Sequence, residues 1–88
     1  MSATNKKKPV NKKLDREAIA QQIIKRAPGP VISRPEAWRL SGYEIAPTTF
    51  RNLDSLGKGP GGRVKIGRRV GYRTEAFARW LAERIELV

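Results

Sequence analysis

The sequence predicts a mainly α-helical fold with one β-hairpin, preceded by an extra N-terminal helix. Apolar residues recur at helical spacing in four segments. Between residues 63 and 73 they instead alternate with polar residues, which is the period of a half-buried strand. Pro or Gly residues separate the first three helical segments from one another and the third of them from the alternating segment. A chain of 88 residues has room for one small domain.

The net charge of +11 is concentrated in two segments. Residues 1–14 contain five lysines and no acid, and residues 57–73 contain six basic residues and no acid. Such charge favours a polyanionic partner, either nucleic acid or an anionic membrane surface. Residues 1–13 are too polar to bury a core, so we predict a disordered basic arm, with a merely solubilising tail as the alternative. The arm offers five candidate phosphate contacts: Lys6, Lys7, Lys8, Lys12 and Lys13.

The composition disfavours catalysis and membrane insertion. The chain contains no Cys and no His, so thiolate metal ligands and the commonest general base are missing. No apolar run approaches the roughly 18–20 residues that cross a bilayer, and no apolar stretch follows the N-terminal lysines as in a secretory signal. We expect a cytoplasmic protein that is not an enzyme and uses no cofactor, metal or small-molecule substrate.

The first predicted helix covers residues 14–27, where isoleucines and alanines form one stripe and Asp15 caps the start. This stripe would pack on its own domain or, alternatively, dock on a neighbouring copy. A second helix is predicted over residues 34–41. Residues 33–36 match a capping box, in which Ser33 accepts from the Glu36 amide and the Glu36 carboxylate reaches back to the Ser33 amide.

The third predicted helix starts at Pro47 and carries Phe50, Leu53 and Leu56 on one side. The other side is polar, and its outward residues are candidate DNA contacts: Thr48, Thr49, Arg51, Asn52 and Ser55. Residues 57–62 formally match a Gly-x-Gly-x-x-Gly dinucleotide motif. That motif needs a preceding strand and a following helix, whereas the predicted order here is the reverse, so we expect a loop.

The alternating segment is predicted to be a β-hairpin. A three-residue loop over residues 67–69 would pair Ile66 with Val70 and Val64 with Tyr72, so that all four face inward. A two-residue turn would instead flip one strand over. The basic side chains would face outward or stand at the tip, and they are candidate DNA contacts: Arg63, Lys65, Arg68, Arg69 and Arg73.

The last predicted helix covers residues 74–85, with Thr74 as its cap and both Trp residues in or beside the core. Helix, turn, helix, basic hairpin and helix is the order of a winged helix-turn-helix, which we assign to residues 31–88. A helix with small polar residues outward suits the major groove, where Arg51 could contact guanine and Asn52 adenine. Hairpin arginines suit phosphates or the adjacent minor groove. We therefore expect double-stranded DNA as the partner.

Residues 31–85 resemble the small excisionases, or recombination directionality factors, and the related AlpA-type regulators with a MerR-like winged helix. The most specific part is "VKIGRRVGYRTEAFARWL", where a basic hairpin runs into a helix that bears Trp. The resemblance implies that residues 48–55 are the recognition helix and residues 63–73 the wing. The turn between Gly42 and Phe50 is two residues longer than is usual in the family.

The resemblance also implies a function. Such proteins bind repeated attachment-site DNA as adjacent, head-to-tail copies, bend it and, with a site-specific integrase, promote excision of a mobile element. The resemblance thus implies a nucleoid-associated protein of a bacterium or phage. An AlpA-type transcriptional regulator is an alternative. A small basic RNA-binding protein is a further alternative, although only Tyr43 and Trp38 would be free to stack on bases. Binding of residues 14–27 to a membrane surface is disfavoured by the mixed charge of that helix.

Overall fold

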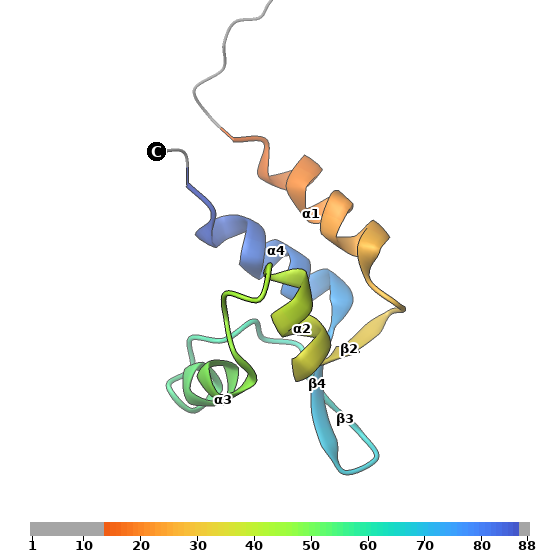
Figure 1. Ribbon diagram of the computed structural model, residues 1–88, viewed down its shortest axis with the longest axis vertical. Helices are drawn as coiled ribbons and strands as arrows, with labels where there is room; N and C mark the ends of the chain where they lie inside the picture. Colours follow the sequence, from red (N-terminus) through yellow and green to blue (C-terminus); the bar gives the residue numbers. More distant parts are fainter. Residues whose placement is uncertain (1–13, 87–88) are drawn as a thin grey trace, which may run out of the picture.

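The computed structural model describes residues 14–86 (Figure 1). Over that range the chain forms four helices and one three-stranded antiparallel sheet, a mixed α/β architecture. The elements in chain order are α1 (Arg16–Arg26), β2 (Val31–Ser33), α2 (Arg34–Leu40), α3 (Pro47–Ser55), β3 (Arg63–Ile66), β4 (Arg69–Arg73) and α4 (Thr74–Arg84). The four predicted helices and the hairpin are present. The predicted arm, residues 1–13, lies outside the described residues together with its five lysines.

The strand β2 was not predicted, and it changes the fold class from mainly α with one hairpin to mixed α/β. It pairs with β4, which places Ile32 opposite Tyr72 and gives the sheet the order β2-β4-β3. Only three residues long, β2 is too short for an alternating pattern to be visible in the sequence. Ile32 is nevertheless fully buried, so β2 contributes to the core.

The hairpin register differs from the prediction. Ile66 lies opposite Arg69 and Lys65 opposite Val70, so the turn consists of two residues, Gly67 and Arg68. Gly67 has a φ of 64°, and a glycine at the first position is typical of the type II′ turn that two-residue hairpins favour.

This register turns β3 over relative to the expected arrangement. Val70 and Tyr72 lie on the side of the sheet that carries the core, together with Arg63 and Lys65. The predicted inward positions of Val64 and Ile66 were therefore wrong: both lie on the other side, and Ile66 is 48% exposed.

The helix α1 packs along α4 in the antiparallel sense (Figure 1). Ala20 and Ile23 are buried in the common core, so the apolar stripe of α1 covers its own domain. The ends are tied as well, because the Arg16 guanidinium donates to the carbonyl oxygens of Ala82 and Ile85. Glu17 of α1 pairs with Arg79 of α4 at 2.9 Å.

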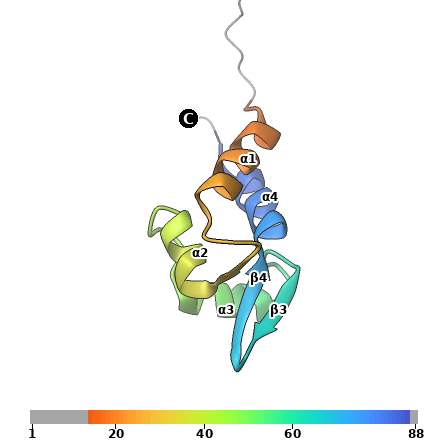
Figure 2. The ribbon, with the colours of Figure 1, turned by 90° about the vertical axis from the view of Figure 1, so that its right-hand side faces the viewer.

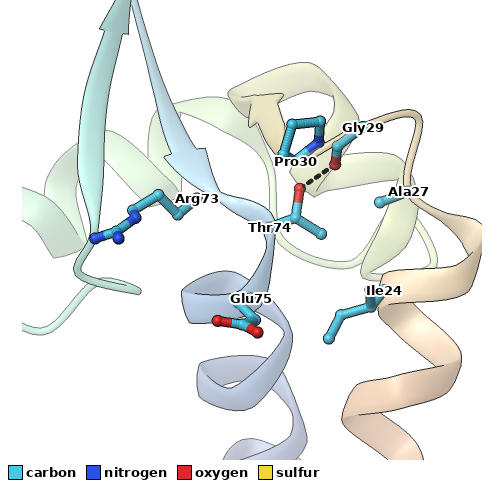
Figure 3. Close-up of a pocket in the computed structure, with 7 residues that line it drawn as sticks. All are labelled: Ile24, Ala27, Gly29, Pro30, Arg73, Thr74 and Glu75. Atoms are coloured by element: carbon cyan, nitrogen blue, oxygen red, sulfur yellow. Dashed lines mark hydrogen bonds between the residues drawn. The ribbon is translucent and has the colours of Figure 1, made fainter.

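The loop between α1 and β2 is fixed on the first residue of α4. The Thr74 hydroxyl donates to the Gly29 carbonyl at 2.5 Å, and the Thr74 amide donates to the Pro30 carbonyl at 2.9 Å (Figure 3). Thr74 was predicted to be the N-cap of α4, but the cap position is Arg73. The hydroxyl instead joins two segments that are 45 residues apart in sequence.

An aromatic cluster connects α3 to the sheet and to α4. The ring of Phe50 lies 5.8 Å from that of Tyr72, 6.0 Å from that of Phe77 and 5.7 Å from that of Trp80, measured between centroids. The indole N–H of Trp80 also donates to the Lys58 carbonyl at 3.0 Å. These contacts hold α3 and the segment after it against the rest of the domain.

Candidate nucleic-acid interface

The helix α3 presents a polar face to solvent. Pro47 occupies the first turn, and Phe50 is fully buried on the opposite side. The five polar residues predicted to point outward are all exposed: Thr48, Thr49, Arg51, Asn52 and Ser55. Leu56 was predicted to face inward, but it is 67% exposed. Six residues after Phe50, it lies about 120° around the helix from that buried side chain.

The helix α3 and the β3–β4 hairpin lie at the same end of the molecule, opposite the end at which α1 begins (Figures 1 and 2). In both views the hairpin tip projects beyond α3. Arg68 is in the turn, Arg63 and Lys65 lie on the core side of the sheet, and Arg69 lies on the other side; all four are exposed. The structure thus places cations on both sides and at the tip of the hairpin.

Arg73, predicted to contact DNA with the other hairpin cations, occupies a different place. It is the last residue of β4 and lines a pocket with Thr74 and Glu75 at the base of the hairpin. In Figure 3 its guanidinium points away from the apolar wall of that pocket, which Ile24 and Ala27 form. Arg73 is therefore separated from the tip by the length of β4.

Acidic partners are distributed unevenly among the cations. Arg39 pairs with Glu36 at 2.8 Å, Arg79 with Glu17 at 2.9 Å, and Arg34 is also paired. Glu36 was expected to complete the capping box by reaching back to the Ser33 amide, but it accepts from Arg39 instead. Within residues 14–86, the cations of α3, the Gly-rich loop and the hairpin form no salt bridge: Arg51, Lys58, Arg63, Lys65, Arg68, Arg69 and Arg73.

One acid lies beneath this cationic surface, within a triad formed by Arg34, Asp54 and Tyr72. The Asp54 carboxylate on α3 accepts from the Arg34 guanidinium at 2.7 Å and from the Tyr72 hydroxyl at 2.5 Å. The Nε of Arg34 also donates to the Tyr72 hydroxyl at 3.2 Å. The Asp54 side chain is only 5% exposed and that of Arg34 16%. The triad therefore joins the start of α2, the last turn of α3 and the middle of β4 in a nearly dry environment.

The triad shifts the titration of its members. Burial away from water raises the pKa of Tyr72 to about 12, and the hydrogen bond to the Asp54 carboxylate adds to this rise, while that from Arg34 opposes it. Burial tends to lower the pKa of Arg34, but its bonds to Tyr72 and Asp54 outweigh that effect and leave the pKa above its ordinary value. The phenol therefore stays protonated and the guanidinium stays charged at neutral pH.

The Gly-rich loop after α3 closes over Asp54. A Cβ at Gly59 would lie 2.1 Å from the Oδ1 atom of Asp54, so only glycine fits there without displacing the carboxylate. The Gly-x-Gly-x-x-Gly match in this loop follows a helix and precedes a strand, as predicted, which is not the order of a dinucleotide site.

The triad was missed in the sequence analysis, although one signal was present. Asp54 is the single acid between residues 45 and 74, in the most basic part of the chain. An acid there has a choice of cationic partners, and an aspartate four residues after Phe50 lies on the buried side of the same helix. Its pairing with Arg34 could not be derived, because that pair depends on the packing of α2 against α3.

Two specific kinds of site are absent from the described residues, a metal-binding cluster and a membrane-spanning helix. In residues 14–86, no three carboxylate side chains come together in a group that could hold a metal ion. The helices of this range are also too short or too polar to cross a bilayer. Comparisons of the chain with protein-family models, curated proteins and solved structures found no match.

Proposed function

We propose that the protein is a non-catalytic DNA-binding protein with a winged helix-turn-helix, in which α3 is the recognition helix and the β3–β4 hairpin is the wing. The observation that carries this proposal is the unpaired charge of one end of the molecule. Arg34, Arg39 and Arg79 have acidic partners at 2.7–2.9 Å, and the described residues outside 45–74 hold seven cations and seven acids. Residues 45–74 hold seven cations and a single acid, Asp54, which is paired with Arg34, so the cations of α3 and the hairpin have no acidic partner among residues 14–86. Phosphates are the partner that would compensate such a surface.

The two elements would have different tasks. The width of the B-DNA major groove admits one helix, and the exposed face of α3 offers the guanidinium of Arg51, the amide of Asn52 and three hydroxyls for base edges. The hairpin tip, with Arg68 and Arg69, would contact phosphates or enter the minor groove beside it. Bases would thus be contacted mainly by α3, and the wing would mainly fix its position.

We further propose the excisionase role that the sequence resemblance implies. The protein would bind attachment-site DNA in adjacent head-to-tail copies, bend it and assist a site-specific integrase in excising a mobile element. The exposed face of α3 and the hairpin carry amide, hydroxyl and guanidinium groups, which suit a factor that binds DNA and supplies only geometry. An AlpA-type transcriptional regulator would use the same surface, so the two roles are separated by an assay of excision with and without the protein.

The DNA-binding proposal is tested by fluorescence anisotropy with a labelled duplex from low to moderate salt. Neutralisation of about six phosphates gives a slope near −5 when the logarithm of the binding constant is plotted against that of the salt concentration. A flat response would contradict the proposal. Structured RNA is then added as a competitor, and displacement of the duplex at equal concentrations would favour the RNA-binding alternative.

A further inference from the structure

We propose that Asp54 is the positioning residue of α3: held by Arg34 and Tyr72, it fixes the rotation of the helix about its axis and thereby determines how strongly one DNA sequence is preferred over another. This inference rests on the proposed function and assigns a task within it to a residue that touches no DNA. It predicts a change in sequence preference, which is distinct from a change in overall affinity.

The geometry gives α3 two attachment points on one side chain of β4. Phe50 and Asp54 are one turn apart and lie on the same side of the helix. The ring of Phe50 packs 5.8 Å from the ring of Tyr72, and the carboxylate of Asp54 accepts from the hydroxyl of Tyr72 at 2.5 Å. The buried ring of Phe50 limits rotation of the helix by its shape, and the hydrogen bond of Asp54, which is directional, adds a second constraint one turn further along.

Arg34 makes the attachment rigid. Its guanidinium contacts both other members of the triad, at 2.7 Å from the Asp54 carboxylate and 3.2 Å from the Tyr72 hydroxyl. Gly59 closes over the other carboxylate oxygen. Asp54 is therefore enclosed by groups from α2, β4 and the loop that follows α3, and a rotation of α3 would break charge-assisted bonds in a nearly dry environment.

A small rotation would matter for base contacts. The side chains of a helix reach about 6 Å from its axis, so a rotation of about 20° moves their tips by about 2 Å. Hydrogen bonds to base edges tolerate only about 0.5 Å of distance variation, so they would be lost. Contacts of flexible lysines and arginines with phosphates depend mostly on charge and would persist.

Stability alone does not account for such a triad. A buried ion pair costs so much desolvation that apolar residues of similar volume often stabilise a protein equally well or better. Removing one partner is costly, whereas removing all of them at once can be neutral. A triple variant, Arg34→Met/Asp54→Leu/Tyr72→Phe, therefore separates the two roles, since it restores apolar packing without restoring directional bonds.

The test uses the full chain and duplexes selected by the wild-type protein from a randomised pool, with the unselected pool as the comparison. The measured quantity is the dissociation constant for the unselected pool divided by that for the selected duplexes. The folded fraction of a variant affects both constants equally and therefore cancels from this ratio. We expect Asp54→Ala, which removes the acceptor of both hydrogen bonds, and the triple variant to lower this ratio at least about tenfold, the equivalent of one lost base contact, with little change in binding to the pool. Urea denaturation should show the triple variant to be more stable than Asp54→Ala.

Asp15→Ala is the matched control, because it removes the same carboxylate from an exposed cap of α1. It should destabilise the helix start and leave the ratio unchanged. An unchanged ratio in a folded Asp54→Ala variant or in a folded triple variant would overturn the inference and leave the proposed function standing. A wild-type protein that binds neither the pool nor any selected duplex would overturn the proposed function, and this inference with it.

Discussion

The hydroxyl of Tyr72 on β4 donates a 2.5 Å hydrogen bond to the carboxylate of Asp54 on α3. The two residues are 18 positions apart, and both are shielded from water. Because the Tyr72 ring also packs on Phe50, one side chain of the hairpin contacts α3 at two points on the same side of the helix.

Removal of the Tyr72 hydroxyl should destabilise the protein while keeping the aromatic cluster. In Tyr72→Phe the carboxylate loses a donor in a dry environment, so we expect the free energy of unfolding to fall by about 2 kcal/mol in urea denaturation. Tyr43→Phe, at a position 61% exposed, is the control and should change it by less than about 0.5 kcal/mol. Equal losses in the two variants would contradict the importance of the buried bond.

The same phenol should make stability depend on alkaline pH. Burial raises the pKa of Tyr72 from 10.0 to about 12, so the folded protein holds this proton more tightly than the unfolded chain. The protonated Tyr72 phenol contributes its full share of the free energy of unfolding below pH 10, and this share is lost as the pH rises through 12. We expect the urea midpoint of the wild-type protein to fall over that interval more than the midpoint of Tyr72→Phe; parallel falls would contradict the assignment.

Gly59 should tolerate no side chain, unlike a glycine elsewhere in the chain. In Gly59→Ala the new methyl group would lie 2.1 Å from Asp54 Oδ1, and the resulting overpacking should cost roughly 1–3 kcal/mol of unfolding free energy. Gly29→Ala meets no atom within 4 Å, so it should be neutral or slightly stabilising. Thermal denaturation compares the two, and a harmless Gly59→Ala would mean that the loop does not enclose the carboxylate.

The two proposed contact classes should respond differently to loss of an arginine. Arg51→Ala on α3 should weaken binding to a selected duplex by about 1–3 kcal/mol with little effect on random DNA. Arg68→Ala at the hairpin tip should weaken binding to all duplexes alike and make the salt slope shallower by about 1. Anisotropy titrations on selected and random duplexes measure both effects, and identical losses for the two variants would contradict the division of tasks.

Local signals in the sequence were sufficient for the helices and for the outward face of α3. Apolar spacing, capping residues and Pro or Gly breaks are properties of neighbouring residues, so helices at residues 16–26, 47–55 and 74–84 could be predicted within a few positions. The same holds for the outward orientation of Arg51 and Asn52, because one buried residue, Phe50, fixes the side of the helix.

Features that depend on distant segments were missed or wrong. The strand β2 is formed by pairing with β4, about 40 residues later, and the three residues Val31–Ser33 carry no pattern that predicts a strand. The predicted hairpin register was wrong. It placed four apolar residues on one side of the hairpin, whereas Gly67 favours a two-residue turn that leaves Ile66 exposed. The Arg34–Asp54 pair likewise needs the packing of α2 on α3.

The central claim, that α3 and the hairpin form a duplex-binding surface, is tested most directly by NMR. Amide chemical shifts of the full-length protein are recorded while a duplex is added. The account predicts the largest shifts in residues 47–55 and 63–70, with small changes in α1. Shifts concentrated in α1 and the middle of α4, or none at all at low salt, would contradict it.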